Sequence, residues 1–154
     1  MTTYYLDTSA LIKRYVDEAG SDWLRATVSR RGSASILVAN LAIVEVTSAL
    51  MRRVRDGSLT STDYASLQSA FRNDLMMEYS LMNVVDNTIN RAKSLIEQHP
   101  LRGYDAVHLA TALVANEQLV LHNLSPIIFL SADDRLNDAA SAEGLAVDNP
   151  NNHP

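Results

Sequence analysis

Short apolar segments alternate along this chain with longer segments that have the polar and apolar spacing of helices. The short segments cover residues 3–7, 35–39, 79–85, 127–131 and 145–147. The longer ones cover residues 10–15, 22–31, 62–77, 87–98, 104–119 and 134–143, with one more long helix between Asn40 and Gly57. Strands that alternate with helices predict an α/β sandwich with a mainly parallel sheet. The length of 154 residues fits a single domain over residues 1–148, followed by a short tail at 149–154.

Several residues mark the expected helix boundaries. Asn40 is the expected N-cap of the long helix, and Thr60 or Ser61 is the expected N-cap of the next one. The pair Gly20-Ser21 is expected to break the chain and cap the helix that ends at Arg31.

The composition narrows the possible kinds of protein. An apolar fraction of 47% and a charged fraction of 20% are typical of a globular protein. The absence of cysteine excludes disulfides and thiolate metal sites, and four scattered histidines do not form a zinc motif. The sequence has neither a signal peptide nor a membrane span, so we expect a cytoplasmic protein. The net charge of −5 argues only mildly against nucleic-acid binding, because arginines cluster at 30–31 and at 52, 53 and 55.

Four acids occupy positions where the fold alone does not call for acids. Asp7 and Asp133 each follow an apolar run that predicts a strand, Glu45 interrupts an apolar run, and Asp105 opens an apolar helix. Ligands of α/β proteins collect at the carboxyl ends of the strands, which is where Asp7 and Asp133 are expected. Carboxylates that converge from such distant segments repel one another unless cations lie among them. The four acids therefore predict a divalent-metal site.

Each acid also has a simpler interpretation. Asp7, Asp105 and Asp133 could be helix N-caps, a role in which aspartate is common. Glu45 is expected in the middle of a helix, where capping cannot explain it, although it could be a surface acid. His108 shares a helix face with Asp105 and could be a ligand or base, but we interpret it as a packed residue with a local hydrogen bond.

Four motifs resemble those of PIN-domain ribonucleases, and in particular VapC-type toxins of toxin–antitoxin pairs. They are YYLDTSAL at residues 4–11, IVEV at 43–46, YDAVHLATA at 104–112 and FLSAD at 129–133 followed by Arg135-Leu136. They occur in order and at matching spacings over nearly the whole chain. The resemblance implies a three-layer, PIN-like fold with a central sheet flanked by helices. Asp134 is a second candidate for the fourth acid, but the spacing from Ser131 favours Asp133.

The resemblance also implies endonucleolytic cleavage of RNA. Mg²⁺ or Mn²⁺ suits ligands that are all oxygen. We expect Asp7 and Asp105 to contact metal most directly, and Glu45 and Asp133 to bind a second metal or orient water. Ser9 and Ser131 are expected to hold carboxylates or phosphate. Lys13, Arg14, Arg52 and Arg102 are possible phosphate contacts, but we interpret them as solvated helix charges.

Two other functions remain open at this point. A haloacid-dehalogenase-like phosphohydrolase also has an aspartate after its first strand, but it needs a second acid where this chain has Ser9. A non-catalytic interaction module on the same fold would have no reason to keep four mutually repelling acids.

The resemblance further implies a small antitoxin partner and a homodimer. Apolar residues of the stretch 67–82 could form a partner surface, or they could pack inside the domain: Leu67, Phe71, Leu75, Met76, Met77 and Met82.

Overall fold

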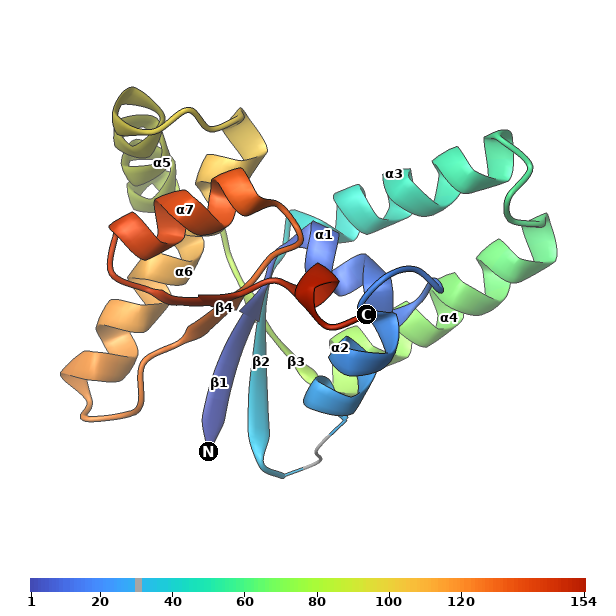
Figure 1. The fold of residues 1–154 in the computed structure, drawn as a ribbon, viewed down its shortest axis with the longest axis horizontal. Coiled ribbons are helices and arrows are strands. Elements are labelled where there is room, and N and C mark those ends of the chain that lie inside the picture. Colours follow the sequence, from blue (N-terminus) through green and yellow to red (C-terminus); the bar gives the residue numbers. More distant parts are fainter. Residues whose placement is uncertain (30–31) are drawn as a thin grey trace.

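The computed structural model describes residues 1–29 and 32–154, and at its centre is one parallel sheet (Figure 1). Its five strands lie in the order β3-β2-β1-β4-β5. They are β1 (Thr2–Leu6), β2 (Ala34–Ala39), β3 (Tyr79–Met82), β4 (Ile128–Leu130) and β5 (Ala146–Asp148), and every neighbouring pair is parallel. The predicted strands and the predicted parallel sheet are confirmed.

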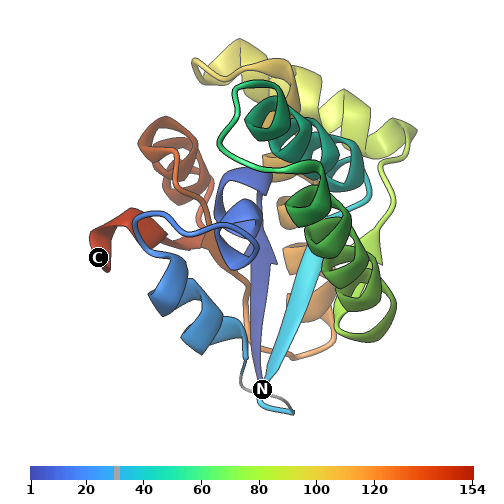
Figure 2. The ribbon, with the colours of Figure 1, turned by 90° about the vertical axis from the view of Figure 1, so that its right-hand side faces the viewer.

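Helices cover both faces of the sheet and complete the three layers (Figures 1 and 2). They are α1 (Thr8–Leu11), α2 (Ser21–Val28), α3 (Ala42–Arg55), α4 (Ser61–Met77), α5 (Asp86–Gln98), α6 (Gly103–Leu121) and α7 (Asp134–Ala142), with the 3₁₀ turns η1 (Ile12–Arg14) and η2 (Pro150–Asn152). Alternate strand residues point to opposite faces. Tyr5 and Phe129 therefore join a core with α5, α6 and α7, while Leu6 and Leu130 join a second core with α1 to α4.

The start of α3 differs from the prediction. Leu41 is the N-cap and provides no side-chain bond, while the Asn40 side chain accepts a hydrogen bond from the backbone N–H of Val84 at 3.4 Å. The prediction that Asn40 caps this helix was wrong, because its amide instead ties the end of β2 to the loop after β3. Glu45 consequently lies in the first turn of α3 and not in mid-helix. In that turn, the positive end of the helix dipole favours a carboxylate.

Other boundaries follow the expected residues more closely. Thr60 caps α4 in a reciprocal capping box with Asp63. Gly20 precedes α2 with φ of 81°, whereas the Ser21 hydroxyl donates to the carbonyl of Val16 and does not cap the helix. The helix ends at Val28, and the predicted end at Arg31 and the pair Arg30-Arg31 lie outside the described residues.

The last residues of the chain pack against α2. Pro150 is buried, and the imidazole of His153 stacks on the indole of Trp23 with ring centroids 4.1 Å apart. A Cβ added to Gly20 would lie 2.2 Å from the carbonyl oxygen of Pro150, so only glycine fits this approach. Among the described residues, no helix combines the length and the apolar character needed to cross a membrane.

The apolar stretch at residues 67–82 divides between core and surface. Phe71 is buried, Leu67 and Leu75 pack against the second core, and Met82 packs against the first. Met76 and Met77 remain exposed at the end of α4, at 77% and 73%. Packing inside the domain therefore accounts for most of this stretch.

Candidate functional site

The four predicted acids line a single cleft of about 740 Å³ at the carboxyl edge of the sheet. Asp7 directly follows β1, and Asp133 follows β4 and precedes α7. Glu45 and Asp105 come from the first turns of α3 and α6. Four N-terminal helix ends thus bring acids to one place, which we call the acid cleft, and their dipoles reduce the repulsion among the carboxylates.

Asp7 is the most deeply placed of the four, with 3% of its surface exposed. Its Oδ1 accepts hydrogen bonds from Ser9 Oγ at 2.7 Å and from the backbone N–H of Ala10 at 2.9 Å, and its Oδ2 accepts one from Ser131 Oγ at 2.8 Å. Asp7 thus also caps α1. Burial raises the pKa of the Asp7 carboxyl, although the nearby His108 and these hydrogen bonds act in the opposite direction. The two serines hold this carboxylate, as predicted.

A threonine and a histidine form hydrogen bonds with Glu45. Thr8 Oγ1 donates to Glu45 Oε1 at 2.8 Å, and His108 Nε2 lies 2.6 Å from the same oxygen. Burial acts to raise the pKa of Glu45, but the hydrogen bonds from His108 and Thr8 outweigh it, and the net shift is downward. A cluster of four acids by itself predicts that the like charges raise the pKa of Glu45. That prediction is wrong, because His108 and Thr8 bond directly to the carboxylate and lower its pKa.

Asp105 and Asp133 share an arginine. Arg102 Nε lies 3.2 Å from Asp105 Oδ2, and Arg102 Nη2 lies 3.6 Å from Asp133 Oδ2. Asp133 accepts backbone hydrogen bonds at the start of α7 and is its N-cap. The capping interpretation of Asp105 was wrong, because α6 begins earlier, with Arg102 as its N-cap. Asp134 accepts a hydrogen bond from Asn149 at 2.7 Å and does not line the acid cleft.

The donor set suits a hard divalent cation, although the side chains as placed do not yet surround one. Among the described residues, no three His, Asp or Glu side chains come close enough together to hold a metal ion. Mg²⁺ needs only one or two direct carboxylates, with water and substrate phosphate completing its shell. The buried Asp7 carboxylate is held by neutral donors, Ser9, Ser131 and the N–H of Ala10, and within the described chain it forms no ion pair with a lysine or arginine. The residues therefore fit a magnesium or manganese ion.

The four candidate phosphate contacts separate into two groups. Arg52 and Arg102 line the acid cleft. Lys13 is buried and bonds to Glu18 and the carbonyl of Ala19, so the interpretation as a solvated charge was wrong, and it does not line the acid cleft. The same holds for Arg14, which is paired with Asp74 of α4 and with Glu78, the C-cap of that helix.

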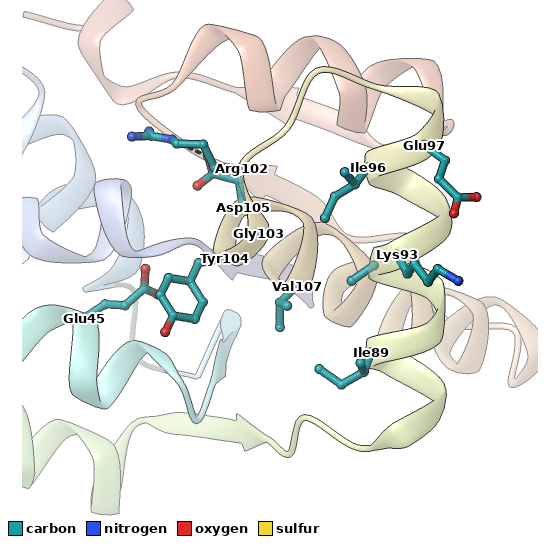
Figure 3. A pocket seen from close by; sticks show the side chains of 11 residues that line it. Glu45, Ile89, Lys93, Ile96, Glu97, Arg102, Gly103, Tyr104, Asp105 and Val107 are labelled. Atoms are coloured by element: carbon teal, nitrogen blue, oxygen red, sulfur yellow. Dashed lines mark hydrogen bonds and ion pairs between the residues drawn. The ribbon is translucent and has the colours of Figure 1, made fainter.

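A second, more apolar groove of about 800 Å³ adjoins the acid cleft between α5 and α6 (Figure 3). Ile89 and Ile96 of α5 and Val107 of α6 line it, and Glu45, Arg102, Tyr104 and Asp105 line both spaces. Tyr104 is 67% exposed where the two meet.

Known proteins resemble this chain in both sequence and fold. The family model for the PIN domain matches residues 4–141. This chain belongs to the PIN-domain family. Ribonuclease VapC49 of Mycobacterium tuberculosis is 30% identical to this PIN domain over 147 residues, which covers 96% of this chain and 95% of the relative.

Solved structures share the PIN fold at lower identity. VapC20 of Mycobacterium tuberculosis, a sarcin–ricin loop cleaving toxin, superposes with a TM-score of 0.63 at 15% identity, over 93% of this chain and 96% of that one. A toxin–antitoxin complex from Klebsiella pneumoniae superposes with a TM-score of 0.58 at 16% identity, over 96% and 97%.

Sequence reasoning gave Thr8 of this PIN domain no role and preferred a packed histidine over a ligand or base for His108. Thr8 and His108 both bind Glu45, from 37 and 63 residues away in the chain. We interpreted His108 as a packed residue with a local hydrogen bond; it is packed, but its partners are distant. Only the fact that His108 shares a helix face with Asp105 could have suggested its place beside the acids.

Proposed function

We propose that this PIN domain is a metal-dependent endoribonuclease and the toxin of a toxin–antitoxin pair. The observation that carries the proposal is the convergence of Asp7, Glu45, Asp105 and Asp133 on one cleft at the carboxyl edge of the sheet. The names of its relatives, ribonucleases of the VapC type, support RNA as the substrate. The family match gives the haloacid-dehalogenase alternative no support.

In the proposed site, Asp7 and Asp105 hold Mg²⁺ or Mn²⁺ most directly, while Glu45 and Asp133 hold a second ion or orient water. A bound ion would lower the pKa of the attacking water and stabilise the leaving oxygen. Ser9 and Ser131 keep the Asp7 carboxylate in one orientation. Arg102 is 79% exposed at its side chain, and with Arg52 it is positioned to receive the substrate phosphates once metal binds the acids.

The test is turnover of a structured RNA by the purified protein in EDTA, and then after excess Mg²⁺ or Mn²⁺ is added. We expect no cleavage in EDTA and recovery with either ion, and no turnover of a generic phosphomonoester. Full activity in EDTA would contradict metal dependence. Hydrolysis of the monoester alone would favour a phosphohydrolase, and no activity under any condition would favour a non-catalytic module.

The proposed assembly is a homodimer that binds a small antitoxin protein. The Klebsiella pneumoniae toxin–antitoxin complex supports the antitoxin partner, and the homodimer rests on the resemblance to VapC-type toxins alone. Light scattering coupled to size exclusion at micromolar concentration should give twice the mass of the chain, 16.9 kDa. A monodisperse monomer would argue against the dimer without affecting the proposed chemistry.

A further inference from the structure

A chain of hydrogen bonds runs from the core of the sheet to Glu45, and the proposed reaction does not yet use it. Tyr5 of β1 is fully buried, and its Oη lies 3.0 Å from Nδ1 of His108, which is 1% exposed. Nε2 of the same imidazole lies 2.6 Å from Glu45 Oε1. Three elements, β1, α6 and α3, are linked in this way beneath the acid cleft.

The order of donors in this chain follows from the phenol. The Tyr5 phenol is fully buried and keeps its proton at neutral pH, as free tyrosine does. A buried hydroxyl needs an acceptor, and Nδ1 of His108 lies 3.0 Å from Tyr5 Oη. If Nδ1 accepts, the proton of the neutral imidazole lies on Nε2. Nε2–H then donates to the Glu45 carboxylate, which the opposite tautomer would repel.

Both protein donors to Glu45 take the same oxygen. Thr8 Oγ1 and His108 Nε2 bond to Oε1, and within the described chain Oε2 has no hydrogen-bond partner. The carboxylate is therefore fixed at one oxygen and open at the other, on the side that lines the acid cleft.

The imidazole itself has little freedom to move. Its ring meets the Tyr5 ring edge to face, with centroids 6.1 Å apart at 73°. Tyr5 in turn stacks on Phe129 of β4 with centroids 5.5 Å apart at 6°. The aromatic side chains of two central strands thus set the position of His108, and through it that of Glu45.

We infer that His108 is a positioning residue for the nuclease site, held by Tyr5 as the Nε2–H tautomer so that Glu45 presents Oε2 to metal or its water. The inference rests on the proposed function only in taking metal or its water as the group that Oε2 contacts. The hydrogen-bond order stands without it. In metal sites, removing a residue that orients a ligand typically lowers metal affinity or activity by about 10- to 100-fold.

The tautomer can be tested on the metal-free protein. In long-range ¹⁵N–¹H NMR spectra of the imidazoles, His108 should show a protonated Nε2 and an unprotonated Nδ1. The Tyr5→Phe variant, which lacks the phenol proton, should lose this fixed pattern. A protonated Nδ1 in the wild-type protein overturns the inference, whether or not the protein cleaves RNA.

The positioning role is tested with two substitutions and a matched control. His108→Gln keeps an amide N–H donor near the Nε2 position, and His108→Leu removes it. A second histidine–glutamate pair, His99 Nε2 to Glu143 Oε1 at 2.8 Å, lies away from the cleft and supplies the control, His99→Leu. Manganese affinity without RNA is measured by calorimetry, and kcat and KM are measured on the RNA that the wild type cuts.

We expect His108→Leu to lower manganese affinity or kcat by about 10- to 100-fold with KM nearly unchanged. His108→Gln should recover most of that loss, and His99→Leu should change only the melting temperature. Equal losses for His108→Gln and His108→Leu, or wild-type values for both, overturn the inference. If His108→Leu does not fold, the glutamine variant and the NMR experiment still decide. A wild type that neither binds manganese nor cuts RNA refutes the proposed function instead.

Discussion

At the scale of single residues, the two most buried acids of the described chain have opposite surroundings. Asp7 is buried with a raised pKa, whereas Asp74, 9% exposed, pairs with Arg14 and accepts a hydrogen bond from Tyr15 at 2.7 Å. Ionisation of Asp7 therefore opposes folding of the metal-free protein, whereas loss of the Asp74 carboxylate would break its ion pair with Arg14.

This contrast gives a prediction for stability. Asp7→Asn should raise the melting temperature at pH 7 in EDTA by a few degrees and abolish cleavage, while Asp74→Asn should lower it. The folded protein binds the Asp7 proton more tightly than the unfolded chain does. Relative to Asp7→Asn, the wild type should therefore gain stability as the pH falls through the raised folded pKa, and the relative gain is complete below the ordinary value of 3.8. Thermal unfolding of the wild type and Asp7→Asn between pH 7 and pH 4 measures this gain. Equal destabilisation by Asp7→Asn and Asp74→Asn would mean that the cap that Asp7 forms on α1 outweighs the cost of burying its charge.

Glu45 gives a prediction for catalysis. Glu45→Gln should lower kcat by about 100-fold or more with little change in RNA binding, since it removes a group that acts on the transition state. Glu97→Gln, in the adjoining groove, is the matched control and should have wild-type kinetics. A Glu45→Gln variant with wild-type kcat would remove Glu45 from the proposed site.

The sequence predicted that the four acids come together, since strand ends and helix starts fix where such residues lie. It did not predict what each acid contacts. Lys13 and Arg14 were interpreted as solvated charges because the sequence does not show their ion pairs, which the folded chain forms with Glu18 and with the two acids near the end of α4. His108 was misjudged for the same reason.

At the scale of helices and strands, prediction was accurate where a local signal decides. The predicted strand bounds lie within a few residues of the observed ones, because a short apolar run is a local pattern. The Thr60 N-cap was predicted because its capping box is also local. The start of α3 was misplaced because Asn40 bonds to a loop more than 40 residues away.

The cap of α4 gives a prediction that separates stability from activity. Thr60→Ala should cost about 1 kcal/mol, typical of losing an N-cap, which corresponds to roughly 2–4 °C in melting temperature for a domain of this size. Thr62→Ala, two residues further along the same exposed turn, should cost less. RNA cleavage should be unchanged in both, as measured below the melting transition. A loss of cleavage in Thr60→Ala alone would indicate that α4 contributes to the site.

At the scale of the whole molecule, metal binding and folding should be linked. An ion that binds only the folded protein stabilises it by about 2.7 kcal/mol at 100 times its Kd, or roughly 5–10 °C here. Mn²⁺ should therefore raise the melting temperature of the wild type, whereas Asp7→Asn should show no such rise. Sodium chloride at equal ionic strength is the control. An equal rise in the variant would mean that manganese binds elsewhere.

The stacking of Trp23 on His153 also makes the end of the chain visible in solution. The chain has a single tryptophan, so its intrinsic fluorescence comes from one indole, and that indole is covered by the imidazole of the second-last residue. Contact with a histidine side chain quenches the emission of an indole. The emission should therefore brighten in His153→Ala, and in the wild type it should follow the docking of residues 150–154 on α2 without any added label.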